Sequence, residues 1–168
     1  MRYRDLINEG NDDAQHKRDL EQTGFWGKQG AGILFVSKKQ KTILFNYRSR
    51  HVEQPGTWGV WGGAIDSREN PVDAAIREAS EESGQNVSKS QIVPAYVFHD
   101  KTSGFKYHNF FAVFDSEFTL NIPSEHAWET QGWGWFGLDD LPSPLQFGAK
   151  ALLQDHNSRM ILKHIFQI

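Results

Sequence analysis

Residues 62–84 read GGAIDSRENPVDAAIREASEESG, and this stretch decides the fold. It opens with paired glycines, which have no side chains to keep a ligand away from the backbone. Asn70 is a typical helix N-cap, Pro71 suits the first helical position, and Gly84 is a typical C-terminal stop. The stretch therefore predicts a loop followed by one helix between Asn70 and Gly84.

Three carboxylates lie on one face of this predicted helix. At ~100° per residue, Glu78 and Glu82 are neighbours, and Glu81 lies about one sixth of a turn away. Like charges repel, and burial increases that penalty unless a cation lies among them. Arg77 can offset only one of the three charges. A solvated acidic face is the alternative, but the spacing favours a divalent cation, and hard carboxylate oxygens favour magnesium or manganese.

The same stretch resembles the signature of the Nudix hydrolases. In that signature a glycine, five residues, a glutamate and seven further residues precede R-E-x-x-E-E-x-G. The matching positions are Gly63, Glu69, Arg77, Glu78, Glu81, Glu82 and Gly84. Two departures fall on aliphatic positions, where Ala79 is small and Gln85 is polar. They concern helix packing and leave the acidic set intact.

Short apolar runs bounded by polar turns lie on both sides of the signature. Residues 30–37 and 42–47 predict a hairpin, residues 58–61 lead into the glycine pair, and strands are expected over 91–99, 105–114 and 132–136. Strands on both sides of one central helix favour an α/β fold. The resemblance implies the Nudix α/β/α sandwich with a mixed β-sheet. We expect a single domain over residues 1–168, with a polar arm over 1–23 and a helical segment over 146–168.

The resemblance also implies roles for the signature residues. It assigns metal binding to Glu78 and Glu82 with support from Glu81, and it has Arg77 orient these carboxylates together with Glu69. A backbone carbonyl at Gly62 or Gly63 could complete the shell. The expected cofactor is Mg2+, with Mn2+ as a substitute.

The identity of the general base stays open at this point. Members of the resembled family use either a signature glutamate, such as Glu81, or one from a later loop. Glu129 is our candidate, because WETQGWGWF over residues 128–136 resembles the family's acidic residue before a Trp-Phe strand. Glu125 is the rival.

Substrate contacts are predicted from residue type and proximity. Arg48 and Arg50 follow a strand close to the signature and could hold a terminal phosphate. Trp61 stands where the family often has proline, so its ring either alters substrate access or packs inside.

Other aromatic and histidine residues are weaker candidates. Trp58, Phe98, Tyr107 and Trp133 could stack a base, although core packing is the commoner use of such residues. His51, His99 and His108 have no zinc spacing and are expected to line a pocket at most. His16 is expected to be solvated.

Composition excludes several classes of function. The chain of 168 residues has a net charge of −3, so it has no basic field for extended nucleic acid. It has no cysteine, which excludes disulfides, thiolate catalysis and cysteine-based zinc sites. The polar amino end is unlike a signal peptide, and no apolar run approaches membrane-spanning length. These features fit a cytoplasmic location.

The sequence therefore predicts a metal-dependent pyrophosphohydrolase that cleaves a nucleoside diphosphate linked to another moiety. Nucleoside triphosphates, ADP-ribose, dinucleotides and nucleotide sugars all remain open as substrates. The alternative is a non-catalytic nucleotide-sensing or scaffolding module on the same fold. An isomerase of prenyl diphosphates shares the fold but is excluded, because the resembled enzymes need a catalytic cysteine. Homodimers are the commonest assembly and the polar arm over 1–23 could serve one, but the sequence does not determine the oligomeric state.

Overall fold

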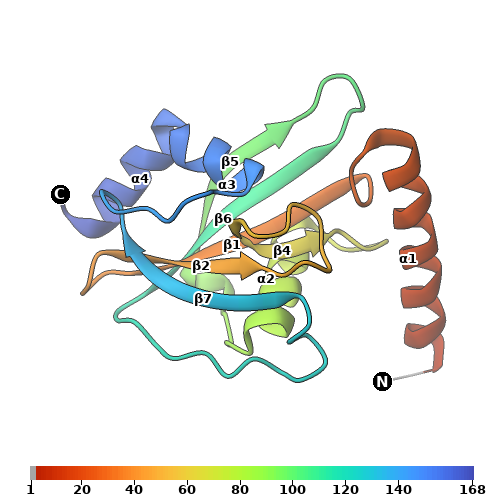
Figure 1. Cartoon of the computed structure of the whole chain (residues 1–168), viewed down its shortest axis with the longest axis horizontal. Coiled ribbons are helices and arrows are strands. Elements are labelled where there is room, and N and C mark those ends of the chain that lie inside the picture. The colour runs from red at the N-terminus through yellow and green to blue at the C-terminus, as the bar shows by residue number, and fades with distance from the viewer. Residues whose placement is uncertain (1–2) are drawn as a thin grey trace.

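The computed structural model describes residues 3–168, with side chains from residue 12 onward. Its helices and strands confirm the predicted α/β class (Figure 1). The helices are α1 (Tyr3–Thr23), α2 (Pro71–Ser83), α3 (Phe147–Gln154) and α4 (His156–Phe166), with a 3-10 turn at Lys89–Gln91. The strands are β1 (Gln29–Ser37), β2 (Thr42–Arg48), β3 (Trp58–Gly59), β4 (Trp61–Ala64), β5 (Ile92–His99), β6 (Lys106–Phe114) and β7 (Thr130–Gly137).

The seven strands form one mixed sheet with β1 at its centre. The path runs β3-β2-β1-β6-β5, while β4 pairs with β1 and β7 pairs with β2. β1 and β6 are parallel, and the remaining pairs are antiparallel. Every residue of β1 after Gln29 is buried. A strand covered on both faces needs a continuous apolar run, which is why residues 30–37 do not alternate with polar residues.

Helices cover both faces of the sheet, as predicted for a sandwich (Figure 1). Successive side chains of a strand point to opposite faces. Ile33 and Phe35 therefore join the core under α2, whereas Leu34 joins the core under α3 and α4 with Leu152. Because α2 is packed from one side only, its position relative to the sheet fixes where its acidic face can open.

The predicted caps of α2 are confirmed. The Asn70 side chain accepts a hydrogen bond from the Asp73 amide at 2.9 Å, and Pro71 takes the first helical position. Gly84 ends the helix with φ of 74°, and its amide donates to the Ser80 carbonyl at 2.9 Å. Both ends of the helix are therefore fixed by local chemistry within the signature.

Three expectations are refined by the structure. The predicted strand over 58–61 is two short strands, β3 and β4, which pair with β2 and β1 respectively. The predicted helical segment over 146–168 is two helices that break at Asp155, because the Asp155 side chain accepts from the Ser158 amide and caps α4. The polar arm is helical from Tyr3 to Thr23, and residues 1–2 lie outside the described part of the chain.

The sequence predicts no apolar run of membrane-spanning length, and the structure tests this for the helices. Across the described residues, none of the helices is both long enough and apolar enough to cross a membrane.

The stop of α2 can be tested at Gly84. A Cβ there would overlap the Asn121 carbonyl oxygen and would also require a left-handed backbone. Gly84→Ala should lower the free energy of unfolding by about 3 kcal/mol or more, measured by chemical denaturation. Gly104→Ala is the matched control, because Gly104 has φ of 79° but open space around it, and it should lose only about 1 kcal/mol. Equal losses in both variants would show that the contact with Asn121 is unimportant.

Candidate functional site

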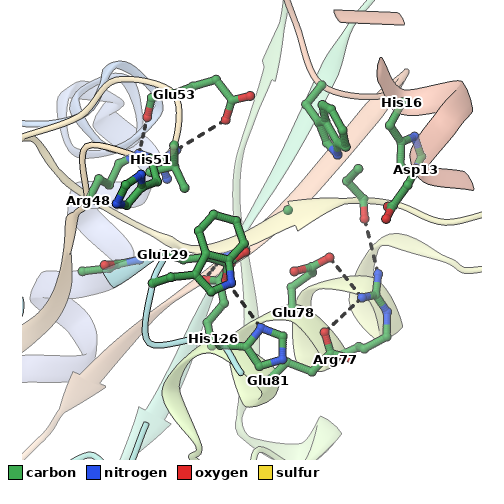
Figure 2. A pocket seen from close by; sticks show the side chains of 18 of the residues that line it. Asp13, His16, Arg48, His51, Glu53, Arg77, Glu78, Glu81, His126 and Glu129 are labelled. Atoms are coloured by element: carbon green, nitrogen blue, oxygen red, sulfur yellow. Dashed lines mark hydrogen bonds and ion pairs between the residues drawn. The ribbon is translucent and has the colours of Figure 1, made fainter. Parts of the chain in front are cut away.

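A cavity of about 760 Å³ opens beside the acidic face of α2 (Figure 2). Five segments line it: α1 with the turn after it, β2 with the loop to β3, β4 with the loop to α2, α2 itself, and the loop before β7. In Figure 2, Arg48 and Glu53 lie at one end of the view, and Asp13 and His16 lie at the other. The cavity therefore brings together residues separated by more than one hundred positions in the sequence.

The glycine pair lies directly against two of the signature carboxylates. A Cβ at Gly63 would lie 2.7 Å from the carboxyl carbon of Glu78, which is closer than such atoms approach in real structures. The Gly62 amide donates a hydrogen bond to Oε2 of Glu82 at 3.2 Å. Glycine at position 63 is therefore required by close approach, and the backbone of Gly62 holds Glu82 in place.

Arg77 binds the surrounding acids through all three guanidinium nitrogens. Its Nε and Nη2 donate to the two oxygens of Glu69, each at 2.8 Å. Its Nη1 donates to Glu78 at 3.0 Å and to Glu81 at 3.4 Å. The fork of Glu69 fixes the plane of the guanidinium, so the third nitrogen is aimed at the acidic face of α2.

Burial changes the acidity of these groups. Burial raises the pKa of Glu78 to about 7, against the opposing charge of Arg77 and with the charge of Glu81 adding to the increase. Burial, together with the charges of Glu78 and Glu129, raises the pKa of Glu82 well above its usual value. Burial opposes the charge of Arg77, but the hydrogen bonds that it donates to Glu69 and the charge of Glu78 still raise its pKa. The site thus brings together more carboxyl groups than its cationic side chains can neutralise.

The donor set fits a divalent cation. Glu82 is only 8% exposed, and within residues 12–168 it forms no ion pair. No three His, Cys, Asp or Glu side chains in the described chain are already arranged around one metal position. The reason is visible in the contacts: Arg77 draws Glu78 and Glu81 to itself, whereas Gly62 holds Glu82. Closely spaced carboxylate oxygens are the donors that Mg2+ and Mn2+ prefer.

The loop before β7 brings one of the two rival glutamates to the cavity. Glu129 is partly buried and lines the cavity, with Oε2 lying 3.5 Å from Nδ1 of His126. Burial raises the pKa of Glu129, although the neighbouring His126 acts in the opposite direction. Glu125 is exposed and does not line the cavity. Of these two loop glutamates, Glu129 is the one that lines the cavity beside α2.

One of the two predicted arginines lines the cavity and the other does not. Arg48 lines the cavity, where its Nε donates to the Glu53 carbonyl at 2.8 Å. Arg50 is exposed and is not part of the lining. That Arg50 contacts substrate stays a prediction, and its exposed side chain lies beside the lining residue His51, with Nε donating to Nε2 of His51 at 3.5 Å.

Three further candidates, Trp58, Trp61 and Glu69, do not line the cavity. Trp61 is fully buried, and its indole donates to the Leu44 carbonyl at 3.3 Å, so it packs in the core and does not control access. Trp58 packs against Phe136 with ring centroids 5.1 Å apart and is not part of the lining. Glu69 holds Arg77 and does not line the cavity.

The remaining aromatic and histidine candidates also differ in whether they line the cavity. Phe98, Tyr107, Trp133, His99 and His108 do not line the cavity, whereas His51 does. The tryptophans that line it are Trp26 and Trp128, and the sequence reasoning missed both. An aromatic residue in a loop carries no local signal that distinguishes a pocket wall from a surface position.

His16 is the clearest error of the sequence reasoning. It was expected to be solvated, but it is 6% exposed and lines the cavity. Its Nε2 lies 3.1 Å from Oδ1 of Asp66. No local pattern in residues 12–20 could have shown this, because the partner is fifty residues away in the sequence.

Comparison with known proteins gives the family. Residues 27–156 match the family model described as the NUDIX domain. The chain belongs to the NUDIX family. The match begins after α1, so the helix that supplies Asp13 and His16 to the cavity lies outside the matched NUDIX span.

The match to individual NUDIX relatives covers only part of their sequences. A provisionally named 8-oxo-dGTP diphosphatase of Mycobacterium tuberculosis is 38% identical over 72 residues, which are 40% of this chain and 33% of that protein. A Streptomyces rubellomurinus protein named CMP-5'-(N-acetyl-N-hydroxy-3-aminopropyl)phosphonate hydrolase is 31% identical over 119 residues, covering 71% of this chain and 56% of its own. The chain thus spans about a third of the length of the first curated relatives it matches.

A solved NUDIX structure confirms the fold. The crystal structure of a MutT NUDIX hydrolase from Burkholderia pseudomallei is similar to this chain, with a TM-score of 0.59 and 25% identity. The similarity covers 77% of this chain and 98% of that one.

The raised pKa of Glu78 predicts how stability depends on pH. The unfolded Glu78 titrates near its usual 4.5 and the folded one near 7, so the folded state binds more protons between these values. In the presence of a chelator, the free energy of unfolding should therefore fall from pH 5 to pH 8, by on the order of 2 kcal/mol. Chemical denaturation at a series of pH values measures this slope.

Glu78→Gln is the control for this prediction. The variant cannot ionise at position 78, so its stability should depend less steeply on pH over the same range. Parallel slopes for the two proteins would contradict the assignment of the effect to Glu78.

Proposed function

We propose that the protein is a metal-dependent pyrophosphohydrolase that acts on a nucleoside diphosphate linked to another moiety. The observation that carries the proposal is the buried carboxylate of Glu82, held by the Gly62 amide beside Glu78 in a cavity large enough for a nucleotide. Membership of the NUDIX family supports the same class of reaction. Two relatives are named for hydrolysis of different nucleotide compounds, so they support the class without selecting a substrate.

Glu78 and Glu82, with Glu81, would hold Mg2+ or Mn2+, and a carbonyl of the glycine pair would complete the shell. A bound divalent cation supplies positive charge that neutralises the diphosphate and polarises its oxygens. Arg77 keeps Glu78 and Glu81 oriented through the contacts described above. Because phosphoryl transfer depends mainly on positioning and charge, a rigid acidic face is the central requirement of this chemistry.

Glu129 is the proposed general base. It accepts the proton of the water that attacks phosphorus, while the bond between that phosphorus and the bridging oxygen breaks. Burial raises the pKa of Glu129, which makes its carboxylate a stronger proton acceptor than an exposed one.

Arg48 is the proposed phosphate ligand at the other end of the cavity. In this structure its guanidinium is held by Glu53, at 2.8 Å from the carbonyl and 3.8 Å from the carboxylate. A substrate phosphate would therefore replace a partner that Arg48 already has.

A substrate panel tests the proposed function. We expect nucleoside triphosphates, ADP-ribose, dinucleoside polyphosphates or nucleotide sugars to release a nucleoside monophosphate in the presence of Mg2+, as measured by chromatography. A chelator should abolish the release. Glu82→Gln should slow it by about a thousandfold or more, because the cation contributes several kcal/mol to the transition state. Binding without turnover of any compound would instead favour a nucleotide-sensing module.

The choice of base is tested by a matched pair of variants in the same loop. Glu129→Gln should lower kcat by about a hundredfold or more, since it removes the proton acceptor. Glu125→Gln should leave kcat unchanged, because that side chain is exposed and outside the cavity. If the glutamine at 129 is harmless, a signature glutamate must be the base.

A further inference from the structure

Helix α1 contacts the site although it lies outside the matched NUDIX span. Its residue His16 is buried in the cavity wall, and the carbonyl of His16 accepts a hydrogen bond from the Gly27 amide at 3.4 Å. The helix is also tied to the signature loop by a hydrogen bond from Ser67 to Asp12 at 2.8 Å. α1 is thus attached to the same loop that carries Asp66.

A continuous series of contacts runs from His16 to the acidic face of α2. His16 Nε2 lies 3.1 Å from Oδ1 of Asp66. The other oxygen of Asp66 lies 3.1 Å from Nη2 of Arg77, and Nη1 of Arg77 donates to Glu78 at 3.0 Å. An ionised carboxylate accepts hydrogen bonds and cannot donate them, so Nε2 of His16 must be the donor to Asp66. Figure 2 shows His16 and Arg77 on the same side of the cavity.

Packing alone does not explain a histidine at this position. Nδ1 of His16 is buried and has no hydrogen-bond partner among the described residues. A buried nitrogen without a partner is unfavourable, and an apolar side chain of similar size would fill the space without that penalty. The contact with Asp66 is therefore the feature that an apolar residue could not supply.

Asp66 needs such a contact in order to hold Arg77. It lies in the loop between β4 and α2, and its side chain is 26% exposed, so water competes for it. Nη2 of Arg77 is shared between Asp66 and Glu69. Fixing one oxygen of Asp66 from α1 leaves the other directed at Arg77.

We propose that His16 is a positioning residue that holds Arg77, through Asp66, in the orientation that arranges Glu78 and Glu81. The inference deepens the proposed function. Among its tests, only the kinetic measurement depends on that function. It assigns α1 to the active-site assembly and not only to the outer surface of the fold.

Two substitutions at His16 separate positioning from packing. His16→Gln keeps a terminal amide that can donate to Asp66, whereas His16→Leu keeps the volume and removes the donor. Arg18→Ala is the control on the same helix, because Arg18 is exposed and its side chain bonds only to Gln15 among residues 12–168. Thermal unfolding of all three variants reports whether the packing of α1 survives.

The primary readout needs neither metal nor substrate. In the metal-free protein, NMR measures hydrogen exchange of the Arg77 guanidinium, assigned with Arg77→Lys. We expect exchange to be about tenfold faster in His16→Leu, and close to wild type in His16→Gln and Arg18→Ala. The dissociation constant for Mn2+, from calorimetry, should rise about tenfold in His16→Leu only. With an active nucleotide, kcat should fall in His16→Leu while KM changes little.

The outcomes are distinct. If the guanidinium protons of Arg77 exchange equally fast in wild type and in a folded His16→Leu variant, the positioning role is overturned. If His16→Gln behaves like His16→Leu, donation to Asp66 is not the basis of the effect, and the proposal also fails. If the wild type hydrolyses no nucleotide, the proposed function fails, but the exchange measurement still decides the role of His16.

Discussion

The constraint on which this structure depends is the burial of two carboxylates against a glycine pair. Glu78 and Glu82 project from α2 onto β4, where the absence of side chains at Gly62 and Gly63 gives them room. Burial disfavours the ionised form of both carboxylates, and the raised pKa of each group reflects this penalty. The arrangement persists because the apolar face of α2 is packed against the sheet and cannot rotate away.

That constraint explains features far from the acids. The central strand β1 carries Gly30 and Gly32 opposite β4, and a Cβ at either position would collide with the ring of Tyr107. The partly buried tyrosine therefore fills the space that the glycines leave. Arg77 is held on the other side by Glu69 and Asp66, so that one cation serves four acids. Under the proposed function, a bound divalent cation would supply the positive charge that these carboxylates lack.

Several parts of the fold and the site could be read directly from residue spacing. The caps of α2 at Asn70 and Gly84 are local, and local chemistry transfers from sequence to structure without reference to the rest of the chain. The proximity of Arg77 to Glu78 and Glu81 follows from helical periodicity. Contacts over long separations were accessible only where a resemblance supplied them, as with Glu129.

The sequence by itself determined the NUDIX signature, the capped helix and the set of acids on one face of that helix. Only the tertiary structure decided which other side chains meet those acids. It placed Arg48 but not Arg50 in the cavity lining, buried Trp61 in the core, and brought His16 from α1 to Asp66. The physical reason is that helix periodicity and caps depend on neighbours a few residues apart, whereas a cavity wall depends on how separate elements pack around one centre.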